Sequence, residues 1–164
     1  MSTGYYVLVS IHVLAALLWL GGMLFLGVVG APVLRAIEPP ALRQRLFGEL
    51  GRRFRTVGWS AVAVLVVTGT LMLGSRGLLH WSVLGTAAFW RTAFGTALAF
   101  KLIAVTTMIV VSAVHDFLHG PAAGRARPGS PTAVAMRRRA ALLARANALV
   151  GILLVLAAVR LARS

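Results

Sequence analysis

Four long apolar runs, separated by short polar stretches, make up most of this chain. They cover residues 5–29, 57–73, 94–114 and 140–159. A helix of about 20 residues crosses the hydrocarbon layer of a bilayer, and in lipid a helix satisfies its own backbone hydrogen bonds. The pattern therefore predicts an all-α integral membrane protein, a four-helix bundle with up-down-up-down topology and a single transmembrane domain over residues 1–164.

The first connection has a second, narrower pattern. Residues 40–56 place Leu42, Leu46, Leu50 and Phe54 at steps of four, with arginines on the remaining faces. This spacing is typical of an amphipathic helix, which we expect on the inner membrane surface, with a solvated linker as the alternative.

The other two connections differ in composition. Residues 120–136 are rich in Pro, Gly and Arg, which predicts a flexible cytoplasmic loop. Residues 74–93 are too apolar for an ordinary loop and too short to cross, and Trp81 and Trp90 favour an interfacial segment.

Composition agrees with a membrane protein, since 59% of residues are hydrophobic and 12% charged. The formal charge of +14 could indicate nucleic-acid binding, but most cations gather on one side of the predicted bundle. That side is cytoplasmic by the positive-inside rule, so we expect both termini outside a bacterial or archaeal cytoplasmic membrane, and no nucleic-acid partner. Twelve of the 17 cationic residues lie there: Arg35, Arg43, Arg45, Arg52, Arg53, Arg55, Arg125, Arg127, Arg137, Arg138, Arg139 and Arg145.

Ionisable groups inside the outer half of the bundle form one candidate site. His12 and Lys101 fall at similar depths in the first and third spans, and burying such groups is costly unless they are paired or neutral. Met72 lies in the same half, as does Thr68, and His80 lies in the loop above. A neutral imidazole is a common metal ligand, including for haem iron. The alternative is that His12 bonds a neighbouring helix while Lys101 extends toward the interface.

A second polar cluster closes the third span. His115 and His119 are spaced i, i+4 and could share a metal, with Asp116 orienting a ring. The alternative is a helix end at the interface, because Gly120 and the proline after it stop the helix; Asp116 would then pair with an arginine such as Arg145.

Other chemistry has few candidates. With three carboxylates and no cysteine, the chain offers no paired-acid catalysis, disulfide or thiolate metal site. No catalytic residue is assigned. The methionines do not form a ladder that would pass Cu(I) along a pore.

Several motifs together resemble a known group. They are W-L-G-G-M-L-F-L after His12, R-F-R-T-V-G-W entering the second span, F-K-L-I-A-V around Lys101, and A-V-H-D-F-L-H-G-P closing the third. This layout resembles the small four-helix proteins of the CopD-like (copper resistance D) superfamily and is similar to the HemJ-type protoporphyrinogen oxidases.

The resemblance implies two functions. The HemJ type implies b-type haem and an oxidoreductase activity, with His12 as an iron ligand, Lys101 as the partner of a propionate and His115 as a candidate for a separate inner site. We expect first a redox or electron-transfer protein that binds haem b, with a quinone or another membrane redox protein as electron partner. The CopD name implies instead copper transport or resistance, using His12, Met72 and His80. A cofactor-free assembly or scaffold protein is the third hypothesis, and a homo-oligomer stays open.

Overall fold

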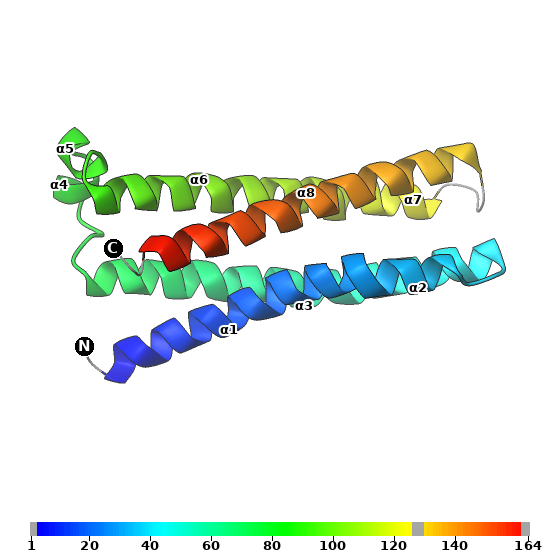
Figure 1. The fold of residues 1–164 in the computed structure, drawn as a ribbon, viewed down its shortest axis with the longest axis horizontal. Coiled ribbons are helices and arrows are strands. Elements are labelled where there is room, and N and C mark those ends of the chain that lie inside the picture. The colour runs from blue at the N-terminus through cyan, green and yellow to red at the C-terminus, as the bar shows by residue number, and fades with distance from the viewer. Residues whose placement is uncertain (1–2, 126–129, 162–164) are drawn as a thin grey trace.

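The structure is a computed structural model that describes residues 3–125 and 130–161, and every regular element in that part of the chain is a helix (Figure 1). Four helices are long and apolar enough to cross a membrane: Thr3–Arg35, Pro40–Ser75, Ala93–His119 and Pro131–Leu156. The predicted fold class, an all-α membrane bundle with four spans, is confirmed.

The helices follow the chain in this order, with two π-helical segments inside longer helices. They are α1 (Thr3–Phe25), η1 (Leu26–Gly30), α2 (Ala31–Arg35), α3 (Pro40–Ser75), α4 (Trp81–Leu84), α5 (Ala87–Trp90), α6 (Ala93–Ala113), η2 (Val114–His119), α7 (Gly120–Arg125) and α8 (Pro131–Leu161).

Two connections are more helical than their composition suggests. Residues 40–56 run without a break into the second span as the first half of α3, so they do not form a separate helix. Within residues 120–136, expected to be a flexible loop, α7 occupies Gly120–Arg125 and α8 begins at Pro131. Residues 126–129 lie outside the described part. Residues 74–93 hold the short helices α4 and α5.

Local signals explain where the long helices begin and end. Thr92 caps α6, where its hydroxyl accepts a 3.0 Å hydrogen bond from the Gly95 amide, and Ser130 does the same for α8 with Ala133 at 3.2 Å. The end of α3 is followed by Gly77 with φ of +67°, a left-handed conformation that glycine adopts without steric cost.

The four long helices run antiparallel along the chain, and Figure 1 places α2 and α7 at one end of the bundle with α4, α5 and both chain ends at the other. We call these the Arg-rich end and the α4–α5 end. Helix α1 packs mainly on α3, and α6 packs mainly on α8. Small residues allow the close contacts: a Cβ at Gly151 of α8 would lie 2.8 Å from Leu20 Cδ1.

The apolar side chains are arranged for lipid and not for water. Large hydrophobic residues such as Leu14, Leu17 and Ile103 are more than half exposed, and the buried core consists mainly of small residues such as Ala15, Ala61 and Ala104. Since lipid tails are as apolar as leucine, helices in a bilayer gain little from burying leucine and instead pack small residues against each other.

Candidate functional site

The half of the bundle nearer the α4–α5 end (Figure 1), which the sequence predicts to be the outer half, brings His12 of α1 against Thr68 of α3. His12 Nδ1 lies 2.8 Å from Thr68 Oγ1, although the two residues are 56 positions apart. Gly69, the next residue of α3, leaves space for the ring, since a Cβ there would lie 3.5 Å from His12 Cε1. Thr68 is buried and His12 is partly buried.

The bonds of Thr68 determine which ring nitrogen carries the proton. Thr68 Oγ1 lies 2.7 Å from the Val64 carbonyl oxygen, which can only accept, so the hydroxyl proton points there. Thr68 Oγ1 is then an acceptor toward the ring, and His12 Nδ1–H must donate to it. The neutral ring therefore keeps a lone pair on Nε2, the state that binds a metal.

Lys101 lies near this ring, and Arg76 lies near Lys101. Lys101 of α6 is close enough to His12 to interact with it electrostatically, and Arg76 is close enough to Lys101. The Arg76 guanidinium donates to Tyr5 Oη at 2.7 Å. All three acidic residues, Glu38, Glu49 and Asp116, lie in the Arg-rich half. Among residues 3–125 and 130–161, no Asp or Glu side chain therefore neutralises Lys101.

The other expected outer residues are less enclosed. Met72 is partly buried and stands one helical turn beyond Thr68 on the same face of α3. His80 is exposed and directly precedes α4, whose first residue, Trp81, is 86% exposed. Met72 therefore shares a helix face with Thr68, the residue bonded to His12, whereas His80 lies on an exposed connection.

At the other end of the third span, Asp116 is held by two partners in the π-helical segment η2. His115 Nδ1 lies 2.8 Å from Asp116 Oδ1, and Trp59 Nε1 of α3 donates to Oδ2 at 3.0 Å. The expected pairing of Asp116 with Arg145 is not found among the described residues. The indole N–H of Trp59 occupies the position that sequence reasoning gave to an arginine.

Arg55, one turn from Trp59 on α3, also contacts η2, but through the backbone. Its Nη1 donates to the Asp116 carbonyl oxygen at 3.1 Å, and its guanidinium lies over the Phe117 ring at 5.6 Å. A π-helix leaves backbone groups with irregular hydrogen bonds, and such segments often occur at functional sites. Here α3 supplies donors to that irregular segment.

The two histidines of η2 have separate partners. His119 Nδ1 lies 3.3 Å from the Val114 carbonyl oxygen, while His115 uses Nδ1 toward Asp116. No group of three or more His, Asp or Glu side chains that could hold a metal occurs in residues 3–125 and 130–161. In this part of the chain, His115 and His119 therefore have no third His, Asp or Glu side chain with which to bind a metal.

Asn147 of α8 joins three helices at the depth of this cluster. Its Nδ2 donates to Ser112 Oγ of α6 at 2.8 Å and lies 3.7 Å from Met23 Sδ of α1. The side chain is 4% exposed, and its Oδ1 has no hydrogen-bond partner among residues 3–125 and 130–161.

A cavity of about 890 Å³ occupies the Arg-rich half, between α1, α3, η2 and α8. Apolar side chains form most of its wall, and Asn147, His115 and Asp116 lie on it together with several arginines. His12 is not among its lining residues. The two polar clusters are therefore separate sites.

Sequence reasoning missed three participants: Trp59, Ser112 and Met23. A signal for Trp59 was available: a tryptophan within a span carries an N–H that needs an acceptor, and Trp59 stands four residues after Arg55. Met23 carried no comparable signal, because its contact depends on how α1 and α8 cross.

Comparison with known proteins adds three findings. A family model described as copper resistance protein D (CopD) matches residues 48–161. An uncharacterized protein of Aquifex aeolicus (strain VF5) is 43% identical over 60 residues, which is 36% of this chain. The match spans 41% of that relative's length. No solved structure matches the chain.

Proposed function

The chain belongs to the CopD (copper resistance protein D) family, and from that membership we propose that it handles copper within the membrane, with His12 as the principal ligand. In this proposal copper is a substrate that enters from the α4–α5 end. One observation carries the proposal: the bond from His12 to Thr68 leaves Nε2 with a free lone pair inside a transmembrane helix.

The chemistry of nearby side chains supports copper over harder metals. Imidazole nitrogen and thioether sulfur are ligands for Cu(I), and Met72 lies one turn from Thr68. Thr68 bonds the ring nitrogen that would not bind the metal and so orients the imidazole, as hydrogen-bonded partners of metal-binding histidines generally do. The Lys101 ammonium repels a bound cation and so weakens its binding. This repulsion suits copper as a substrate that binds and leaves, more than copper as a permanently bound ion.

Haem b is the second candidate, favoured by Lys101. A lone pair on His12 Nε2 also suits haem iron, and an ammonium without an Asp or Glu partner in the described part of the chain suits a propionate. Bound haem would supply one-electron chemistry, for which His12 would hold the iron and Lys101 would orient the ring edge. Because the large cavity includes His115 and not His12, the wall for a haem ring is better formed at the inner site.

The membrane orientation belongs to the same proposal. The arginines of α2, the first half of α3 and the start of α8 gather at one end of the bundle, which the positive-inside rule assigns to the cytoplasm. The copper site would then open toward the outside. A quinone or membrane redox partner would be needed only by the haem alternative.

Metal content and visible absorption of the purified protein test these alternatives together. We expect about one copper ion per chain after exposure to Cu(I), and at least a tenfold loss of affinity in His12→Ala, since removing a ligand removes most of the binding energy. His80→Ala is the matched control, because His80 is exposed and should change affinity little.

Other outcomes would reject the copper proposal. A Soret band in protein from haem-supplied cells, lost in His12→Ala, would establish the haem alternative. A colourless protein without copper or haem would support the cofactor-free scaffold.

A further inference from the structure

The large cavity in the Arg-rich half has a charge that the chain does not balance. Asp116 is the acidic residue on its wall, and both carboxylate oxygens are already engaged by His115 and Trp59. The arginines on the wall, by contrast, outnumber it: Arg35, Arg52, Arg55, Arg137 and Arg145. Of these wall arginines, Glu49 pairs with Arg52, and it also pairs with Arg53, so the cavity keeps a net positive charge that favours an anion.

The same cavity contains an unsatisfied hydrogen-bond acceptor. Asn147 lies on its wall, is 4% exposed, and has a free Oδ1 while its Nδ2 is bonded to Ser112. A buried acceptor without a partner costs free energy, so such groups in native proteins usually meet a ligand or an ordered water. An occupant that donates a hydrogen bond at this depth would remove that cost.

Apolar wall residues continue onto the lipid-facing surface. Val28 of η1 and Leu149 of α8 both line the cavity, and they are 72% and 58% exposed. A molecule inside the cavity could therefore extend an apolar chain sideways into the bilayer along these residues. The cavity combines an anion-attracting wall, a buried acceptor and a lateral apolar exit.

We propose that this cavity binds an anionic phospholipid with a hydroxyl-bearing headgroup, of the phosphatidylglycerol type, from the leaflet at the Arg-rich end. The phosphate lies among the arginines, with Arg145 and Arg55 as the main contacts. A headgroup hydroxyl donates to Asn147 Oδ1, and the acyl chains leave past Val28 and Leu149. The proposal concerns a site separate from His12 and does not depend on copper.

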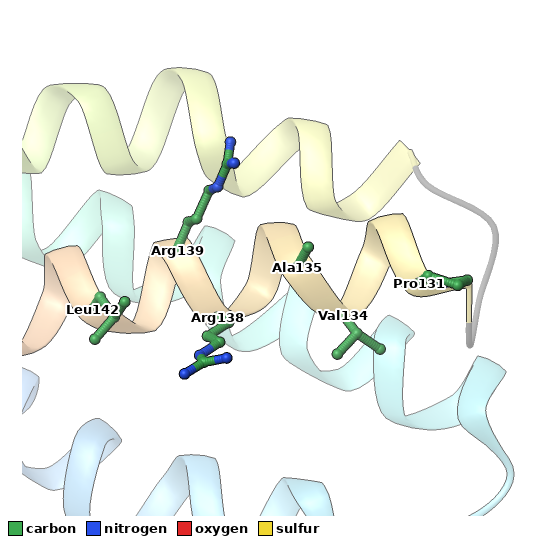
Figure 2. Close-up of a pocket in the computed structure, with 6 residues that line it drawn as sticks. All are labelled: Pro131, Val134, Ala135, Arg138, Arg139 and Leu142. Carbon is green, nitrogen blue, oxygen red and sulfur yellow. The ribbon is translucent and has the colours of Figure 1, made fainter.

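Arg139 provides the matched control for Arg145 on the same helix. It lines a hollow of about 570 Å³ formed by residues of α8 alone, from Pro131 to Leu142. In Figure 2 the side chains of Arg138 and Arg139 leave α8 in different directions within this hollow. Arg139 and Arg145 are both exposed, but Arg139 does not line the large cavity.

The test measures lipid binding to copper-free full-length protein by native mass spectrometry or by titration in detergent micelles. We expect phosphatidylglycerol to bind about tenfold more tightly than phosphatidylcholine. Arg145→Gln should reduce that preference severalfold, while Arg139→Gln should leave it unchanged. Equal losses in the two variants would show only general attraction to a basic surface and would overturn the proposal.

A second arm tests the hydroxyl contact. Phosphatidic acid carries at least as much charge but lacks the headgroup hydroxyls, so it should bind about fivefold more weakly than phosphatidylglycerol to the unmodified protein. Asn147→Leu should abolish that difference. Tighter binding of phosphatidic acid to the unmodified protein would overturn the proposal even if the variant failed to fold.

A third arm identifies the source of the anion. Glycerol 3-phosphate carries the same phosphate and hydroxyl groups without an acyl chain. We expect it to displace the lipid only at concentrations more than a hundredfold higher, because the acyl contacts are lost. Displacement at equal concentration would overturn the assignment to a membrane lipid in favour of a soluble phosphate ester.

Discussion

At the scale of single residues, the outer site depends on one hydroxyl group. Thr68 donates to the Val64 carbonyl and accepts from His12, so a helix backbone group determines the tautomer of a ring on another helix. This arrangement satisfies each buried polar group it uses and leaves one lone pair, on Nε2, directed elsewhere. Under the copper proposal, the ligating atom is thus the one that packing leaves unbonded within the described part of the chain.

Thr68→Val tests this arrangement with little change in shape. Without the hydroxyl, His12 should lose its preference for the Nδ1–H tautomer, visible in the ¹⁵N shifts of the ring, and Cu(I) affinity should fall about tenfold. Thr70→Val is the control, because Thr70 is exposed two positions away. If both variants keep the Nδ1–H tautomer, the proposed role of Thr68 is wrong.

Lys101→Met distinguishes copper from haem as the ligand of the His12 site. Removing the ammonium removes a repulsion from bound copper, so Cu(I) affinity should rise, by about tenfold if the two charges interact at short range. For haem the sign is reversed, because a propionate would lose its partner and haem affinity should fall. Competition titrations with each ligand measure both. Unchanged affinity for both would show that Lys101 lies outside the site.

At the scale of elements, α3 organises both ends of the molecule. It is continuous from Pro40 to Ser75, so its register links Thr68 in the outer site to Arg55 and Trp59, which hold η2. Those two residues are four apart and lie on one face, where they meet the side chain and carbonyl of Asp116. The widened π-turn is thereby fixed by a neighbouring helix.

Trp59→Phe should loosen this contact while keeping an aromatic ring against Phe117, 5.7 Å away between centroids. The variant removes the hydrogen bond to Asp116, and because that carboxylate is partly exposed we expect a loss of about 1 kcal/mol in the free energy of unfolding. Denaturant titration in mixed micelles measures it. Trp81→Phe, at a position that is 86% exposed, should change it by less than about 0.5 kcal/mol. An equal effect of the two variants would contradict the assigned bond.

At the scale of the whole molecule, charge is distributed unequally between the two ends. The basic residues gather at the Arg-rich end around the large cavity, whereas His12 and Lys101 lie nearer the α4–α5 end. Under the two proposals, the molecule would present a copper ligand toward one face of the membrane and an anion-binding cavity toward the other. The orientation of the protein in the membrane decides which compartment the His12 site faces and which the large cavity faces.

Cysteine labelling tests that orientation without a background signal, because the chain contains no cysteine. Ser82→Cys lies on α4 and Thr132→Cys at the start of α8, both at exposed positions on opposite ends. A membrane-impermeant maleimide should label intact cells carrying the first variant, and the second only after permeabilisation. The reverse pattern would place the arginines outside.

The sequence by itself determined the four spans, the membrane class, the side on which the arginines gather and the depth of His12 and Lys101. These properties depend on the length of apolar runs and on position along a helix, both of which are local. The CopD resemblance, carried by short motifs around His12, Lys101 and the end of the third span, is confirmed by the family match.

Only the tertiary structure decided which polar groups meet. The pairs His12 with Thr68, Trp59 with Asp116 and Asn147 with Ser112 join helices across 56, 57 and 35 positions. A shift of one residue rotates a helical side chain by about 100°, so each contact depends on the rotation and offset of two helices, which no local pattern contains. For the same reason the cavity, and the unpaired oxygen of Asn147 on its wall, could not be read from the sequence.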